Sequence, residues 1–86
     1  MKQFQYTIKD PVGIHARPAG LLVKAAKELD STVTVSNAAG KSAAATKLMA
    51  LMGLGIKGGD TVTVAVEGGN EDAGLAAMQR FFEENL

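Results

Sequence analysis

The chain of 86 residues contains no cysteine and a single histidine, His15, and these scarcities exclude several kinds of site. Without cysteine, neither a disulfide nor a thiolate metal site can stabilise the fold. A transition metal also needs several nitrogen or sulfur ligands, which one imidazole cannot supply. We therefore expect no metal site and no cofactor.

An excess of charge of one sign is also missing, since nine basic and nine acidic side chains give a formal net charge of zero. A nucleic-acid-binding domain of this size normally has a basic excess, and only three Phe and one Tyr could stack on bases here. The chain has no apolar run of membrane-spanning length, and residues 1–6 lack the apolar stretch of a signal peptide. We therefore expect a cytoplasmic protein that neither binds nucleic acid nor inserts into a membrane.

The spacing of apolar residues predicts four strands and three helices. Alternation of apolar and polar residues predicts strands over residues 4–8, 32–36, 41–44 and 62–66, with a hairpin turn at 37–40. Helical spacing predicts a first helix over residues 18–29, with Leu21 and Leu22 on its apolar face. It also predicts a short second helix that Thr46 caps and that ends at Met52, and a last helix that Asn70 caps.

The resulting order of elements, βαββαβα, contains a central hairpin and no continuous βα alternation. This order favours an α+β fold in which helices cover one face of an antiparallel sheet. The length suits one domain over residues 1–86 with a modest core. On the last helix, we expect Leu75, Met78 and Phe81 or Phe82 to face this core.

His15 lies in the run Gly13-Ile14-His15-Ala16-Arg17-Pro18-Ala19, which predicts a site for a phosphoryl group. A neutral imidazole keeps a lone pair on one ring nitrogen and can form a covalent intermediate. Pro18 suits the first turn of a helix, which puts His15 at or beside the N-cap. The free backbone N–H groups of Ala16 and Arg17 would then face an anion, and the Arg17 guanidinium suits phosphate oxygens.

A lone histidine in a small domain is more often an ordinary surface residue, so the prediction of a phosphoryl site depends on the whole run of residues around His15. From Gly13 to Gly20 the chain resembles, position for position, the active-site signature of the HPr family, the histidine-containing phosphocarriers of the sugar phosphotransferase system. That signature reads Gly, aliphatic, His, small, Arg, Pro and then small residues. The resemblance continues through Gly40-Lys41-Ser42 and Leu48-Met49-x-Leu51-x-x-Leu54-Gly55.

The resemblance implies a fold and a function. The fold would be an open-faced β-sandwich, with a four-stranded antiparallel sheet covered on one face by three helices. His15 would accept a phosphoryl group on Nδ1 from phosphorylated enzyme I and donate it to enzyme IIA domains of sugar permeases. The chain would then be a stoichiometric carrier and not an enzyme on its own, and we expect a monomer.

The second predicted helix contains more apolar side chains than it can bury. A helix of this length cannot bury all of Leu48, Met49, Leu51 and Met52, so the surplus would form an exposed apolar patch, with Leu48, Met49 and Met52 as the expected docking residues. Flexible methionines suit a surface that accepts several partners. The resemblance implies that this helix packs beside His15 and docks onto enzyme I and IIA domains. Basic side chains would give the docking face a positive rim that suits acidic partner surfaces. The docking residues expected besides the apolar patch are Gly20, Lys24, Lys27 and Lys47, with Arg17 on the same rim.

In many members of the HPr family, a regulatory serine lies at the start of the second helix. Aligning Gly40-Lys41 and Leu48-Met49 without gaps puts Lys47 at that position, with Thr46 one residue out of register. Regulation through a serine is therefore not expected, while phosphorylation of Thr46 stays open.

Two alternatives to the sugar pathway remain at this point. A paralogue in a nitrogen-related phosphorelay would use the same histidine chemistry with other partners. A regulatory module that acts only by docking would have no need of both His15 and Arg17, so the presence of the pair argues against it.

Overall fold

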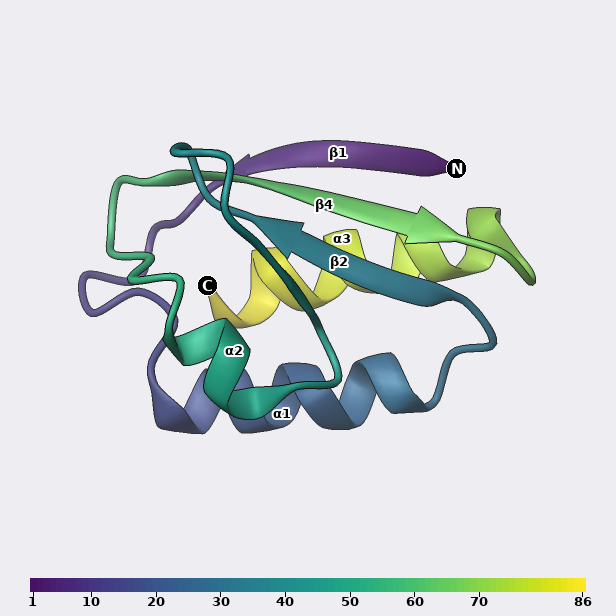
Figure 1. The fold of residues 1–86 in the computed structure, drawn as a ribbon, viewed down its shortest axis with the longest axis horizontal. Helices are drawn as coiled ribbons and strands as arrows, with labels where there is room; N and C mark the ends of the chain where they lie inside the picture. The colour runs from purple at the N-terminus through teal and green to yellow at the C-terminus, as the bar shows by residue number, and fades with distance from the viewer.

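The computed structural model describes residues 1–86 and contains four strands and three helices in the predicted order (Figure 1). The strands form one antiparallel sheet with the order β1-β4-β2-β3. The helices all lie on one face of this sheet, which confirms the α+β open-faced sandwich. The elements are β1 (Lys2–Thr7), α1 (Ala16–Lys27), β2 (Thr32–Ser36), β3 (Ser42–Ala44), α2 (Leu48–Met52), β4 (Thr61–Glu67) and α3 (Glu71–Asn85).

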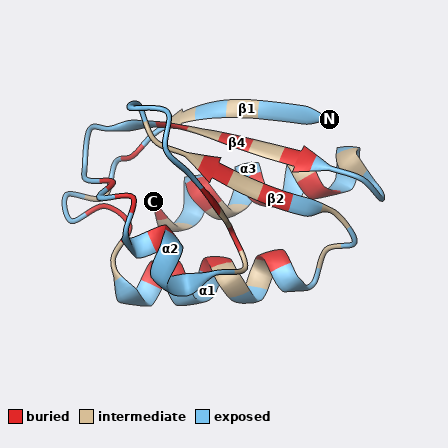
Figure 2. Cartoon of the chain, in the orientation of Figure 1, coloured by how far each residue is buried: buried red, intermediate tan, exposed pale blue.

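Strand β4 lies between β1 and β2 and carries the centre of the core. Its Val62, Val64 and Val66 are fully buried, whereas the residues between them are not, so buried positions alternate along the strand (Figure 2). Val64 pairs with Phe4 of β1 on one side and with Val35 of β2 on the other. Because side chains alternate between the faces of a strand, this register brings apolar residues of three strands onto the face under the helices.

Helix α3 covers this face mainly through Met78 and Phe82, both fully buried. The Phe82 ring meets the rings of Phe4, Tyr6 and Phe81 edge to face, with centroids 5.9, 5.7 and 6.0 Å away. The prediction that either Phe81 or Phe82 is buried is thereby confirmed for Phe82, since Phe81 is only partly buried.

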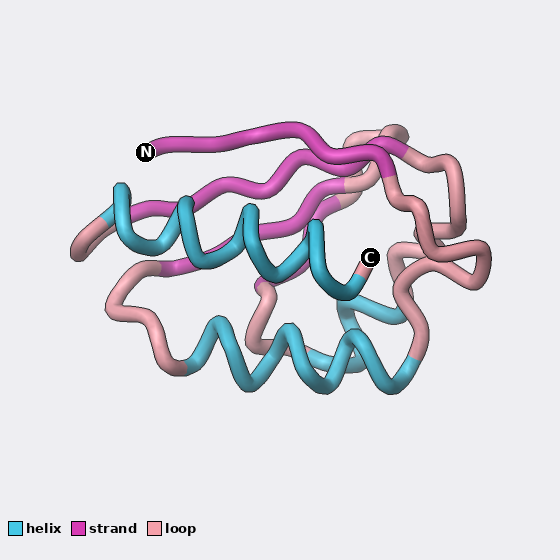
Figure 3. Tube along the Cα trace, turned by 180° about the vertical axis from the view of Figure 1, so that it is seen from behind, coloured by secondary structure: helices cyan, strands magenta, loops and turns pink.

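Helix α1 packs beside α3, and the C-terminus lies at the same end of the molecule as the start of α1 (Figure 3). Helix α1 runs from Ala16 to Lys27, whereas the apolar spacing predicted residues 18–29. His15 is its N-cap, which confirms the prediction made from the position of Pro18. The prediction that Leu21 belongs to the buried face is wrong, since this residue is 45% exposed. Leu22 and Ala26 point into the core at helical spacing, and Leu21 is one position away from that line.

The prediction that Thr46 caps α2 is also wrong. Lys47 is the N-cap, with an extended backbone (φ −114°, ψ 99°) and no side-chain capping bond. The Lys47 carbonyl accepts the first helical hydrogen bond, from Leu51, while the Lys47 N–H donates to Ala44. This second bond closes a turn over residues 45–46, so Thr46 belongs to that turn and not to the end of the helix.

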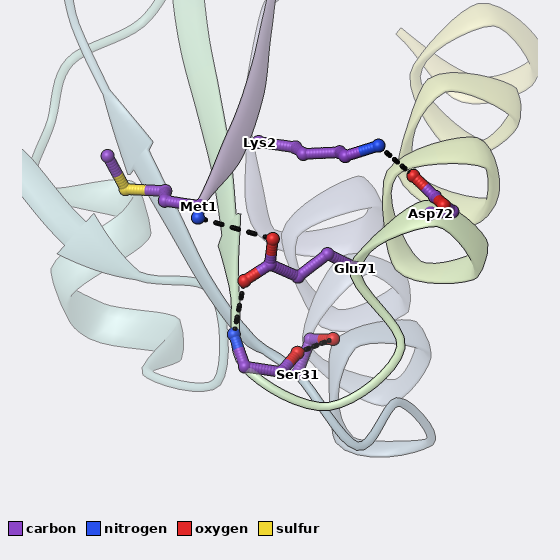
Figure 4. Close-up of polar contacts among 6 residues, drawn as sticks. Met1, Lys2, Ser31, Glu71 and Asp72 are labelled. Atoms are coloured by element: carbon purple, nitrogen blue, oxygen red, sulfur yellow. Dashed lines mark hydrogen bonds and ion pairs between the residues drawn. The ribbon is translucent and has the colours of Figure 1, made fainter.

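The start of α3 is tied to β1 by charged groups (Figure 4). Glu71 accepts a 2.8 Å hydrogen bond from the Gly68 N–H and lies 3.2 Å from the Met1 amine, and both contacts lower the pKa of its carboxyl. Asp72 pairs with Lys2 and raises the pKa of that amine. The predicted Asn70 cap is confirmed by a 3.1 Å bond from the Ala73 N–H to its side chain.

None of the helices combines the length and the apolar character that crossing a membrane requires.

Candidate functional site

His15 is held by its backbone while its side chain stays free. It is the N-cap of α1, with extended torsions (φ −111°, ψ −173°), and its carbonyl accepts the Ala19 N–H at 2.9 Å. The imidazole makes no capping hydrogen bond, and the side chain is 42% exposed. A ring nitrogen is therefore accessible to a group brought by another molecule.

The loop before His15 is anchored on the segment that follows α2. The Ile14 N–H donates to the Ile56 carbonyl at 3.1 Å, and both side chains are buried. Gly13 has a φ of +80°, and a Cβ there would overlap the Ile56 carbonyl oxygen. Only glycine therefore allows this close approach of the two backbones.

The N-terminus of α1 offers an anion two donors. The N–H groups of Ala16 and Arg17 lie in the first turn and find no acceptor within the chain. They share that end of the helix with the positive pole of the helix dipole. The structure therefore places the predicted backbone donors directly after the imidazole.

A hollow of about 370 Å³ opens beside the imidazole. Arg17 lines it and forms no ion pair within the chain, so its guanidinium is available to an external anion. The other lining residues are Asp10, His15, Pro18, Leu21, Glu84 and Asn85.

Sequence reasoning missed the acidic side of this hollow. Asp10 lies with its Oδ2 4.0 Å from His15 Nε2, and its nearness along the chain to the histidine is a signal that could have identified it. Glu84 and Asn85 gave no such signal, because only the folded position of α3 brings the end of the chain to the start of α1.

The predicted docking residues lie on two helices that pack against each other. On α2, Leu51 is fully buried, whereas Leu48, Met49 and Met52 are 39%, 78% and 37% exposed; we call these three the α2 patch. The predicted surplus of exposed apolar side chains is thus confirmed. The remaining predicted docking residues are all exposed: Gly20, Lys24 and Lys27 on α1 and Lys47 at the start of α2.

Comparison with known proteins decides the family. Residues 2–84 match the family described as the PTS HPr component phosphorylation site. The chain belongs to the HPr family. It is 40% identical to the phosphocarrier protein HPr of Mycoplasma genitalium over 85 residues, which is 99% of this chain and 97% of that protein.

Solved HPr structures share the fold. A Mycoplasma histidine-containing phosphocarrier protein superimposes with a TM-score of 0.90 at 30% identity, over 96% of this chain and 93% of the other. The Bacillus subtilis protein Crh, described as an intertwined, domain-swapped dimer, gives a TM-score of 0.77 at 30% identity, over 100% of this chain and 98% of the other. Because a relative so similar can exchange part of its fold, the monomer expected for this chain stays a prediction.

Proposed function

We propose that this HPr-family chain carries a phosphoryl group on His15, accepting it from phosphorylated enzyme I and donating it to enzyme IIA domains of sugar permeases. One arrangement carries the proposal: an unconstrained imidazole at the N-cap of α1, next to two N–H groups without acceptors and to the unpaired Arg17. The chain would act as a stoichiometric carrier in the cytoplasm, and its turnover would depend on its partners.

The transfer step needs a lone pair and an orientation. His15 Nδ1 forms a bond to phosphorus while the bond from phosphorus to the donor atom breaks, and the electron pair of that bond stays with the donor. The Nε2–H of His15 is retained, so the phosphorylated ring carries a positive charge until this proton leaves. The reverse sequence at an enzyme IIA domain returns the Nδ1 lone pair to His15.

The groups around the imidazole match the charge of this transition state. Phosphoryl transfer passes through a loose state in which charge spreads over three equatorial oxygens. The Ala16 and Arg17 N–H groups would offer hydrogen bonds to those oxygens from fixed backbone positions, and the unpaired Arg17 guanidinium would add its own donors. Positioning and electrostatic stabilisation would then suffice, and the chain has no need of a metal of its own.

Docking would use the α2 patch and the basic rim. Lys27 lies about 18 Å along α1 from His15, at 1.5 Å per residue, so the rim extends well beyond the reactive group. Lys24, Lys27 and Lys47 would meet acidic groups at the edge of the partner surface, while the α2 patch fills its apolar centre.

The test is incubation with purified enzyme I and phosphoenolpyruvate labelled in its phosphoryl group. We expect one acid-labile phosphoryl group on His15 and its passage to an added enzyme IIA domain. His15→Ala should take no label while keeping its fold, because the side chain makes no capping bond. Acid-stable label, or label on the variant, would falsify the assignment, and docking without any label would favour the purely regulatory module.

A further inference from the structure

We propose that Asp10 is a positioning residue for phosphoryl transfer, whose carboxylate accepts the Nε2–H of His15 and thereby leaves the lone pair on Nδ1. The proposal rests on the phosphocarrier function argued above. The observation behind it is the approach of Asp10 Oδ2 to His15 Nε2, at 4.0 Å, between two residues that both line the hollow.

The backbone of Asp10 is fixed from two sides. Its N–H donates to the Leu86 carbonyl at 2.8 Å, and its own carbonyl accepts the Gly13 N–H at 3.0 Å. The first bond ties the residue to the end of α3, and the second closes the turn that leads to His15. Neither bond uses the side chain, so a change of side chain leaves both in place.

The carboxylate is fixed as well. Its Oδ1 accepts the Val12 N–H at 2.9 Å, a local turn that aspartate forms readily. This bond uses one oxygen and sets the plane of the carboxylate, so Oδ2 is the oxygen that faces His15. The one basic side chain besides His15 that lines the hollow is Arg17, and it forms no ion pair with Asp10; Glu84 is acidic and does not compete for this carboxylate.

The separation of 4.0 Å is longer than a hydrogen bond and has to shorten by about 1 Å to make one. Rotation of the half-exposed imidazole can supply this movement, because no capping bond holds the ring. Hydrogen bonds around a reacting group are often long in the free protein and tighten in the complex with the partner. The oxygen is therefore placed where the ring needs an acceptor once a donor protein is bound.

The consequence concerns the tautomer of the imidazole. In a neutral imidazole one nitrogen carries the proton and the other the lone pair, and the hydrogen bond that one makes fixes the state of the other. With Asp10 accepting from Nε2, the nucleophilic lone pair is on Nδ1. The same carboxylate faces the positive charge that the ring carries once Nδ1 is phosphorylated.

Asp10→Asn is the decisive variant because the hydrogen bond from the Val12 N–H to Oδ1 fixes which side-chain atom faces His15. The asparagine Oδ1 can still accept the Val12 N–H, which puts the NH₂ group where Oδ2 was and turns an acceptor into a donor. Nε2 must then accept, and the ring proton moves to Nδ1. Glu84→Gln is the matched control, since it removes the same charge from the same hollow at a residue that forms no ion pair with His15.

The ring state is measured by ¹⁵N chemical shifts of His15 in the unphosphorylated protein, without enzyme I. We expect Nε2–H in the wild type and in Glu84→Gln, and a shift of the population towards Nδ1–H in Asp10→Asn. The alanine in Asp10→Ala has neither a donor nor an acceptor, so its population of the Nδ1–H form should lie between those of the wild type and Asp10→Asn. Amide spectra check that each variant is folded, and Asp10→Ala decides should Asp10→Asn not fold.

The second measurement is the rate at which enzyme I phosphorylates the same variants. We expect Asp10→Asn to be slower by on the order of 10-fold or more, the size of effect seen when residues that orient metal-ligating histidines are replaced. An unchanged ring state in both Asp10 variants, or an equal or faster rate in Asp10→Asn, would overturn the proposal. Failure of the wild type to take phosphate at all would instead refute the phosphocarrier function, because the ring measurement does not depend on enzyme I.

Discussion

The two faces of α2 predict opposite effects of substitutions only two residues apart. Leu51 is fully buried and Met49 is 78% exposed. Leu51→Ala should therefore lower the stability of the fold and spare docking, whereas Met49→Glu should spare stability and weaken docking.

The expected loss of stability follows from burial. Truncating a fully buried leucine to alanine costs about 2–5 kcal/mol, because contacts are lost and a cavity is left. For a domain of this size, each kcal/mol lowers the Tm by about 4–8 °C, so even the smallest loss lowers it by about 8 °C. Met49→Glu should change the free energy of unfolding by less than about 0.5 kcal/mol, as is usual for exposed positions.

The expected loss of docking follows from desolvation and charge. An apolar anchor at the centre of an interface contributes about 1 kcal/mol or more, and a glutamate also repels an acidic partner surface. A loss of about 1.4 kcal/mol corresponds to a tenfold higher Kd for enzyme I. Gln5→Glu is the matched control, since it adds the same charge at an exposed position on β1, away from α2.

Urea unfolding and titration calorimetry with unphosphorylated enzyme I measure the two quantities separately. The reasoning is refuted if Met49→Glu lowers stability as much as Leu51→Ala does while its folded fraction binds normally. It is equally refuted if Gln5→Glu weakens binding as much as Met49→Glu, since the effect would then be one of net charge.

The remaining predictions address other parts of the site and the fold. Arg17→Ala should slow transfer in rapid-quench experiments far more than it weakens docking, because the charge it meets is greatest during transfer; equal rates would remove it from the mechanism. Glu71→Gln should be less stable than the wild type at neutral pH. Because the folded pKa of Glu71 is lowered, its contribution is present above the ordinary value of 4.5, and the difference should vanish in acid unfolding series as the pH falls through the folded value. An HPr serine kinase should modify Lys47→Ser but not the wild type. Mass spectrometry that finds phosphate on wild-type Thr46 would contradict the alignment that puts Lys47 at the position of the regulatory serine.

The sequence predicted the elements well where local and tertiary preferences agree. Val62, Val64 and Val66 alternate with threonine and alanine, and the pairing of β4 on both edges buries the face that this alternation defines. The prediction that Thr46 caps α2 was wrong because capping preference is local, whereas the turn closed by the Lys47 N–H and the Ala44 carbonyl is set by how β3 leads into α2.

The residues of the candidate site also divide into those that a local pattern predicts and those that only tertiary packing brings in. His15, Arg17 and the helix start belong to one short string, so the residues alone were enough to predict where they lie. Glu84 reaches the hollow through the packing of α3 on the sheet, which no local pattern encodes. Leu21 was assigned to the core because the apolar stripe of α1 is wider in the sequence than the surface available to bury it.

The anchoring of the His15 loop connects the reactive group to the docking face. Ile14 donates its N–H to Ile56, just after α2, and Gly13 packs on the same carbonyl. A partner that presses on the α2 patch therefore contacts a helix whose following segment holds the His15 loop. Asp10 is held in turn by Leu86 at the end of α3. The imidazole is thus a side chain without a capping bond on a backbone that is tied to the ends of two helices, and in the proposed transfer the partner would bring its phosphorus into line with that ring.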